Sequence, residues 1–374
     1  MSSQAIRSAT SSAPRGARLV EGFRARGCGA ALLIGSGHAA HLLGYQRVYS
    51  GPVAQLIDGE GRTTLIVPVY EVDAARACTG VEDVRGYGEP GFGLDLAIID
   101  KLVSVVSALI PRGRLAVSSE LPGVAGAITA AAGVDSEPID DLVHDVRLIK
   151  DAEELRRIVR AYELALVGQG AVEAGSLPGA QEIELYAAAQ ASAHLAAGSV
   201  TDFGADLLVG DRTALVCGPV AVPGTRQAAD GDVVVADVSV RHEGYWGDTA
   251  RTFIVGENDE AAAVRVSIRE ILDEAASMLR PGVRCSDVFA HVADAIGTRH
   301  PGGSFPHHGG HGIGVTNLED PHLIPADGSS LEEGMVIAIE PGVYFAGRYG
   351  VREEDNYLVT SAGGIELLEL SDSL

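Results

Sequence analysis

Two acidic residues in the second half of the chain lie where one hairpin would bring them together. Asp237 interrupts the apolar segment VVVADVSV, and Asp248 follows 11 positions later, after RHEGYWG. A tight turn centred between His242 and Glu243 would fold this segment into two antiparallel strands. Asp237 would then lie directly opposite Asp248, with Cβ atoms about 4.5 to 5.5 Å apart. Buried carboxylates at that spacing repel one another unless a cation lies between them, so the segment predicts a metal-binding hairpin.

A second pair of acids repeats this pattern near the C-terminus. Glu340 ends the apolar run MVIAIE, and Glu354 follows 14 positions later in VREED. A turn centred on Gly347 would place the two glutamates opposite one another, as proposed for the first pair. Two acid-bearing hairpins would supply four oxygen ligands, which suit hard divalent cations.

A histidine between glycines is the fifth candidate ligand. In HHGGHGIG, glycines flank His311 on both sides. Glycine lets the backbone approach a metal or ligand closely and adopts positive φ freely. Four carboxylates and one imidazole can hold a pair of metal ions bridged by carboxylates, and these ligand types suit Mn²⁺, Co²⁺, Fe²⁺ or Zn²⁺.

Each of these residues also has an ordinary structural interpretation. A single acid in a strand is commonly a salt-bridge partner, and Arg251 and Arg352 are close in sequence to the acids. A lone histidine is more often packed in a core or used as a cap. The metal hypothesis therefore depends on the two paired hairpins together with His311, and on no single residue.

The first part of the chain alternates short apolar runs with helical patterns, which is typical of an α/β layer fold. The expected strands and helix are AALLIG at 30–35, QLID near 55, TTLIVPV at 63–69, the helix DLAIIDKLVSVVSALI at 95–110 and RLAVSS at 114–119.

A helix start marks a domain boundary near residue 150. Asp151 precedes AEELRRIVRAYELAL, and Glu154 lies three positions later, which is the spacing of a capping box. We therefore expect a flexible tail at 1–18, an α/β domain at 19–148 and a second domain at 149–374.

The second domain reads as a mixture of helices and strands. The expected helices cover 180–197, about 258–279 and 286–298, and the expected strands cover 233–240, 248–256, 334–340 and 351–360.

Composition limits the partners of this chain. A length of 374 residues with 46% hydrophobic residues can form two domains with full cores. A formal charge of −23 argues against nucleic acid and against a membrane surface, because both would require a basic face. No run approaches the ~20 apolar residues of a membrane span, and the first residues contain no secretory core, so we expect a cytoplasmic protein. The four cysteines form no CxxC pair and are expected to be free thiols.

Four motifs in order give this chain a family resemblance: ADVSVRHEGYWGDTARTFIVG, GGHGIG, IEPGVY and GVREED. Together they resemble the metal-binding signature of the M24 metallopeptidases of pita-bread fold, which include methionine aminopeptidases, Xaa-Pro aminopeptidases and prolidases. The resemblance implies an α/β N-terminal domain of the prolidase and creatinase type, followed by an α+β pita-bread domain with pseudo-two-fold ligand-bearing hairpins. It implies two divalent metal ions, with Mn²⁺ expected, held by Asp237, Asp248, His311, Glu340 and Glu354.

The same resemblance assigns further roles. His307 matches a substrate-side histidine four positions before the metal histidine, and Arg352 matches an arginine that supports Glu354. Glu340 would be both a ligand and the acid/base group. A metal-activated water would attack an amide carbonyl. Prolidase-type members commonly pair, so a homodimer is expected.

Three positions depart from the family pattern. Peptidases of this family have a histidine seven residues after the metal histidine, where this chain has Leu318, and usually another about eleven residues before the Gly-Asp of the first ligand strand, which falls near Val220. Ser239 replaces a glycine in the first ligand strand. Loss of one group that stabilises the tetrahedral intermediate can cost on the order of a hundredfold in rate.

These departures leave three functional hypotheses. The first is a hydrolase that acts on short peptides with proline at the second position. The second is a metalloenzyme of the same fold with changed chemistry, hydrolysis or elimination, on a small non-peptide amide or amino-acid derivative, which Leu318 and Val220 favour. The third is a binding protein without catalysis, which the intact ligand set and the acidic composition oppose.

Overall fold

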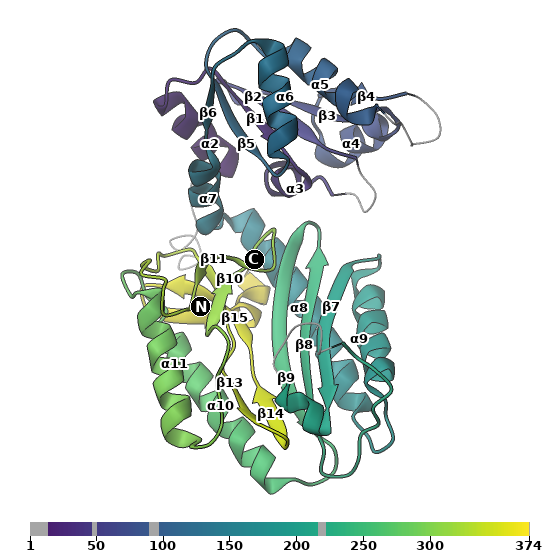
Figure 1. Ribbon diagram of the computed structural model, residues 1–374, viewed down its shortest axis with the longest axis vertical. Coiled ribbons are helices and arrows are strands. Elements are labelled where there is room, and N and C mark those ends of the chain that lie inside the picture. The colour runs from purple at the N-terminus through teal and green to yellow at the C-terminus, as the bar shows by residue number, and fades with distance from the viewer. Residues whose placement is uncertain (1–13, 47–50, 90–96, 216–221, 374) are drawn as a thin grey trace. The chain divides into compact units, whose positions relative to one another are not determined.

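The structure is a computed structural model that describes residues 14–46, 51–89, 97–215 and 222–373. It divides into two compact units, one formed by residues 12–147 and the other mainly by residues 148–374. Each unit is described separately below (Figure 1).

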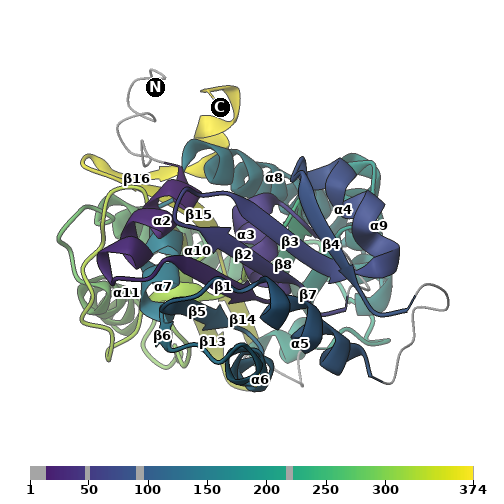
Figure 2. The same cartoon turned by 90° about the horizontal axis from the view of Figure 1, so that it is seen from above.

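The first unit contains, within its described residues, a six-stranded sheet in the order β4-β3-β2-β1-β5-β6. The strands, side by side in Figure 2, are β1 (Ala30–Ile34), β2 (Ala54–Asp58), β3 (Thr63–Pro68), β4 (Asp83–Tyr87), β5 (Leu115–Ser119) and β6 (Ser136–Pro138). β1 pairs antiparallel with β2 and parallel with β5. All five residues of β1 are buried, as a central strand with helices on both faces requires.

Helices cover both faces of this sheet. One face packs against α5 (Ile98–Leu109) and α6 (Pro122–Ala132), and the other against α2 (Arg15–Ala25), α3 (Ser36–Leu43), α4 (Val72–Thr79) and α7 (Asp140–Leu148). The α/β prediction and its strands are thus confirmed. The flexible tail was predicted to extend to residue 18, but α2 already begins at Arg15, so the predicted end of the tail was wrong.

The second unit begins with α8 (Ala152–Gly175), and its predicted capping box is confirmed. The side chain of Asp151 accepts the main-chain N–H of Glu154, and the Glu154 side chain accepts the main-chain N–H of Asp151. α8 and α9 (Glu182–Ala197) pack on a sheet of β7 (Asp202–Val209), β8 (Val233–His242) and β9 (Tyr245–Ile254), with the apolar residues of all five elements in one core.

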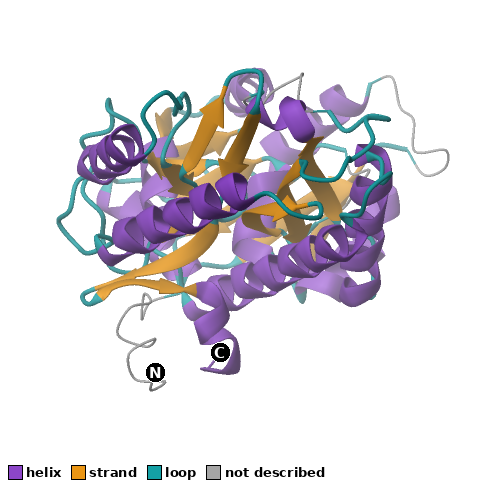
Figure 3. Cartoon of the chain, turned by 90° about the horizontal axis from the view of Figure 1, so that it is seen from below, coloured by secondary structure: helices purple, strands orange, loops and turns teal. Residues whose placement is uncertain are grey.

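The rest of this unit repeats the same layering. α10 (Asp259–Ser277) and α11 (Cys285–Arg299) share a core with a sheet ordered β11-β10-β12-β15-β16. Its strands are β10 (Gly310–Gly312), β11 (Glu319–His322), β12 (Val336–Ile339), β15 (Asp355–Thr360) and β16 (Gly363–Glu366), and β13 (Gly342–Phe345) pairs separately with β14 (Tyr349–Arg352). Figure 3 shows the long helices lying against the strands. No helix among the described residues is long and apolar enough to cross a membrane.

Candidate metal centre and active site

The first acid-bearing hairpin is formed by β8 and β9. Its two-residue turn consists of Glu243 and Gly244, whose φ angles of 48° and 88° are the positive values that a type I′ turn requires. The predicted turn centre was wrong by one residue, so Asp237 lies opposite Ala250 and not opposite Asp248. Moving a turn by one residue changes the register by two, and side chains alternate with a period of two. Both aspartates therefore still face the same side of the sheet.

The second pair of acids lies at one end of the β13–β14 pair. These strands pair about a turn centred on Gly347, as predicted. Glu340 lies two residues before β13, and Glu354 lies two residues after β14. The two glutamates are thus brought to the same end of this hairpin.

The strand expected over 351–360 is interrupted at Glu353 and Glu354. The reason is that the backbone here bonds to a different strand. The N–H of Glu354 donates to the carbonyl of Ala250 at 2.9 Å, and the hydroxyl of Thr249 donates to the carbonyl of Glu354 at 3.0 Å. The interruption therefore ties the second pair of acids to β9, which carries Asp248.

His311 lies in β10, between β11 and β12, and its neighbours must be glycines. A Cβ atom on Gly310 would collide with the carbonyl of Ala338, and one on Gly312 would collide with the carbonyl of Asp320. The Nδ1 atom of His311 lies 2.9 Å from the carbonyl oxygen of Gly312. An Nδ1–H that donates to this carbonyl leaves Nε2 free to bind a metal, and such a bond commonly orients histidines that bind metals.

All five predicted ligands line one cavity of about 350 Å³. Asp248, His311 and Glu354 each place one ligand atom within 4.8 Å of the others, and all three are buried. Asp237 and Glu340 line the same cavity.

The chemistry of this cavity fits a divalent cation. Burial, followed by the charge of Asp237, raises the pKa of Asp248 well above its usual value. Burial and the charge of Asp248 do the same to the pKa of Glu354. The Oε1 atom of Glu354 is buried and has no hydrogen-bond partner among the described residues. A cation among these carboxylates would relieve their repulsion and satisfy this oxygen.

Arg352 has different partners from those that the resemblance implied. Its buried guanidinium forms an ion pair with Asp237, and its Nε donates to the hydroxyl of Tyr344 at 2.8 Å. The salt-bridge interpretation therefore holds for Asp237, whose carboxylate also lines the cavity. Arg352 directly orients the first aspartate and not Glu354.

His307 is not among the residues that line the cavity, but its neighbour His308 is. The Nε2 atom of His307 lies 2.9 Å from the hydroxyl of Tyr344. The Nδ1 atom of His308 lies 2.9 Å from Oε1 of Glu340. Burial would raise the pKa of Glu340, but the contact with His308 together with the charges of His308, His307 and His311 outweighs burial and lowers this pKa to about 2. The sequence predicts no role for His308, and the repeated HisHis at 307 and 308 is the signal that could have indicated one.

Ser239 and Leu318, two of the three residues that depart from the family pattern, line the same cavity. Leu318 lines it with 54% of its surface exposed. Asn317, which sequence reasoning missed, donates from Nδ2 to Oδ2 of Asp248 at 2.8 Å and to the hydroxyl of Ser239 at 3.1 Å. The Ser239 hydroxyl in turn donates to Oδ1 of Asp248 at 2.9 Å. Val220, the other departure, lies outside the described residues.

Comparison with known proteins identifies the family. The family model described as metallopeptidase family M24 matches residues 153–361. An uncharacterized peptidase of Staphylococcus aureus (strain bovine RF122 / ET3-1) is 30% identical over 316 residues, which cover 83% of this chain and 86% of the relative. The chain belongs to metallopeptidase family M24.

Solved structures agree with this M24 assignment. The prolidase of Pyrococcus horikoshii OT3 has a TM-score of 0.81 and 26% identity, over 95% of this chain and 97% of that one. The Xaa-Pro dipeptidase of Bacillus anthracis has a TM-score of 0.79 and 25% identity, over 95% and 97%. The X-Pro aminopeptidase of Thermotoga maritima MSB8 has a TM-score of 0.80 and 25% identity, over 94% and 96%. The chain therefore has the prolidase-type pita-bread fold and is a metal-dependent hydrolase of family M24.

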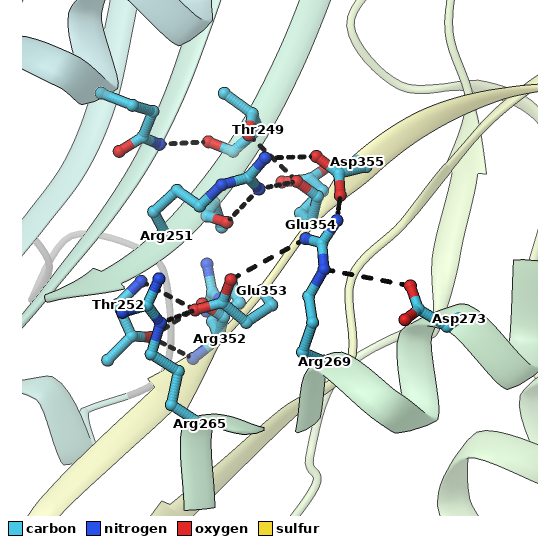
Figure 4. Close-up of polar contacts among 12 residues, drawn as sticks. Thr249, Arg251, Thr252, Arg265, Arg269, Asp273, Arg352, Glu353, Glu354 and Asp355 are labelled. Atoms are coloured by element: carbon cyan, nitrogen blue, oxygen red, sulfur yellow. Dashed lines mark hydrogen bonds and ion pairs between the residues drawn. The ribbon is translucent and has the colours of Figure 1, made fainter. Parts of the chain in front are cut away.

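A buried charge network surrounds Asp355, the residue after the candidate ligand Glu354 (Figure 4). Arg251 donates to the main-chain carbonyl of Glu354 at 2.6 Å and to the carboxylate of Asp355 at 2.5 Å. Arg269 forms an ion pair with Asp355, and the Tyr162 hydroxyl donates to Asp355 at 2.6 Å. Asp355 is fully buried and directly follows the candidate ligand Glu354. Its contacts link β15 to β9, α8 and α10.

Asp355→Asn is expected to lower the free energy of unfolding by about 3 kcal/mol, because it removes the buried carboxylate that pairs with both Arg251 and Arg269. Arg269 then keeps the more distant Glu353, at 3.9 Å, as its buried partner. Chemical denaturation measures this change. Asp273→Asn is the matched control, because Asp273 lies 3.9 Å from the same Arg269 with its side chain 68% exposed. Its expected cost is below about 1 kcal/mol. Equal losses in the two variants would contradict the role given to Asp355.

Proposed function

We propose that this chain is a dinuclear-metal-dependent hydrolase that cleaves the bond before proline in short peptides. The observation that carries the proposal is the meeting of four carboxylates and one histidine in a single cavity. The printed names of the solved relatives, prolidase, Xaa-Pro dipeptidase and X-Pro aminopeptidase, support the substrate class. In this proposal two Mn²⁺ ions are held by Asp237, Asp248, His311, Glu340 and Glu354.

Metal ions held by these residues would supply a polarised amide carbonyl and a water of lowered pKa. Glu340 is the group that accepts the proton of the attacking water and returns it to the departing nitrogen. Its contact with Nδ1 of His308 at 2.9 Å favours the ionised carboxylate and orients it for this role. Arg352 acts on the other side of the cavity, where it holds Asp237 in place.

The remaining roles extend the proposal to the whole chain. We infer that residues 149–374 form the catalytic domain. The domain before it, expected over 19–148 and extended to Arg15 by α2, is inferred to be of the prolidase and creatinase type. The chain is proposed to act as a homodimer in the cytoplasm on a small peptide, without nucleic acid or membrane as partner. The composition supports the exclusion of nucleic acid and anionic membranes, since a formal charge of −23 is repelled by both.

One observation favours the second candidate function, altered chemistry on a small non-peptide amide or amino-acid derivative. The cavity has an apolar side chain, Leu318, where family peptidases place a histidine, and the amide of Asn317 beside it is bonded to Asp248. A scissile peptide carbonyl would lack the donor that this histidine provides in family peptidases. The fold and the metal ligands are compatible with both candidates.

The test is the turnover of Xaa-Pro dipeptides and tripeptides by protein loaded with Mn²⁺, Co²⁺ or Zn²⁺. Glu340→Ala, which removes the acid/base group, is the blank. Turnover by the wild type and its absence in the blank are expected. Silence from a protein shown by elemental analysis to hold two metal ions would reject the Xaa-Pro proposal in favour of the altered chemistry.

A further inference from the structure

Asp206 is a carboxylate of the same cavity that the metal site does not use. It lies on β7, an edge strand of its sheet, directly opposite Asp237. Opposed residues of an antiparallel pair project from the same face, so both carboxylates point toward the cavity. Asp237 is paired with Arg352, but Asp206 has no hydrogen-bond or ion-pair partner among the described residues.

The position of Asp206 is unfavourable for stability alone. Like charges directly opposite one another destabilise a pair of strands. Burial, followed by the charge of Asp237, raises the pKa of Asp206 to about 6. The charge of Arg352 acts on Asp206 only from a distance, since Arg352 pairs with Asp237. A carboxylate that lines a cavity without a directly bound partner is a natural binding group for a cation supplied by a ligand.

A second cavity of about 330 Å³ adjoins the first at Asp206 and Ala205, which line both. Its other walls are Ile183, Tyr186, Val222 and Pro223, all of them apolar or aromatic. Ile183 and Val222 are 44% and 63% exposed, although large aliphatic side chains are usually buried. The ring of Tyr186 is held edge-on against Phe203 at 5.3 Å, which gives the cavity one firm wall.

We propose that Asp206 binds the free ammonium group of a substrate while the adjacent apolar side chain of that substrate enters the second cavity. The order of groups follows the order of the cavities: metal ligands, then Asp206, then the apolar walls. A peptide whose first residue is apolar and unblocked has this sequence of groups, with the amide, the ammonium and the side chain all attached at or next to one carbon. The inference rests on the proposed function and adds a residue that selects the substrate.

The proposal makes two exclusions. A substrate with an acylated amino group loses the cation that Asp206 binds. A substrate whose first side chain is acidic brings a second negative charge toward Asp206 and into apolar walls, which costs binding on both counts. Leu-Pro should therefore be preferred over N-acetyl-Leu-Pro and over Glu-Pro.

The test compares the wild type with Asp206→Asn on these three compounds, both proteins loaded with Mn²⁺. For Leu-Pro we expect the variant to raise KM by about tenfold while kcat changes less than about threefold, since a charge-assisted hydrogen bond to bound substrate is lost. The preference for Leu-Pro over N-acetyl-Leu-Pro should shrink by a similar factor. The preference over Glu-Pro should shrink less, because Glu-Pro keeps its ammonium group and only the repulsion of its acidic side chain is relieved. Asp202→Asn is the matched control, because Asp202 lies on the same strand, pairs with Arg241 and lines neither cavity. It should behave as the wild type.

Two further results would overturn the proposal. If elemental analysis shows that Asp206→Asn has lost Mn²⁺, Asp206 is a metal ligand. If kcat/KM falls equally for all three compounds, Asp206 does not select the substrate. If the wild type turns over no Xaa-Pro peptide, the proposed function fails, but the subsite is still tested by calorimetry with L-leucinamide and N-acetyl-L-leucinamide. Tighter binding of the cationic probe to the wild type, lost in Asp206→Asn, supports the subsite. Equal binding of both probes contradicts it.

Discussion

Glu354→Gln is expected to yield a folded protein that has lost bound metal and at least about a thousandfold of its activity. The side chain is buried with Asp248 and His311 around one point, and its Oε1 atom has no protein partner among the described residues. A neutral amide keeps the size of the side chain but removes the charge that a divalent cation requires. Several kcal/mol of transition-state stabilisation come from such an ion, and each 1.36 kcal/mol is about tenfold in rate.

Elemental analysis measures the metal content and thermal denaturation measures its effect on the fold. A chelator should lower the melting temperature of the wild type, because a ligand that binds only the native state stabilises it. The same chelator should have little effect on Glu354→Gln. Glu332→Gln changes one exposed acid and should retain the wild-type metal content. Unchanged metal content in Glu354→Gln would contradict the ligand assignment.

The sequence was sufficient to predict the elements that carry the site, because their signals are local. The Asp151 and Glu154 spacing locates the start of α8, and apolar runs locate β8 and β12. The turn about Gly347 was predicted correctly, whereas the turn at Glu243 and Gly244 was misplaced by one residue. Asp237 and Asp248 were nevertheless predicted correctly to share one face of the sheet, because side chains alternate with a period of two along a strand.

The polar partners of the ligands could not be predicted in the same way. Whether His307 or His308 lines the cavity depends on the local backbone at a glycine-rich segment. Asn317 and Asp206 reach the cavity from a loop and from β7, at sequence separations of 69 and 31 residues from Asp248 and Asp237. No local pattern encodes contacts of that kind, because they arise from the packing of separate elements.

Leu318→His is expected to raise the turnover of Xaa-Pro peptides by up to about a hundredfold, since one group that stabilises a developing oxyanion contributes about this much. Leu318 already lines the cavity and is half exposed, so a ring at this position can face the substrate without displacing a core residue. The effect should appear in kcat, because the interaction strengthens in the transition state. Steady-state kinetics of the variant on one Xaa-Pro dipeptide measures it.

Leu318→Met is the matched control, because methionine preserves an apolar side chain of similar size and offers no donor. Identical turnover by the histidine and methionine variants, at equal metal content, would mean that this position does not face the scissile bond. A gain from histidine starting from a measurable wild-type rate would instead show that the chain is a slow Xaa-Pro peptidase. A gain from a silent wild type would indicate a cavity adapted to another amide, in which the bonds of Asn317 and Ser239 to Asp248 belong to the changed chemistry.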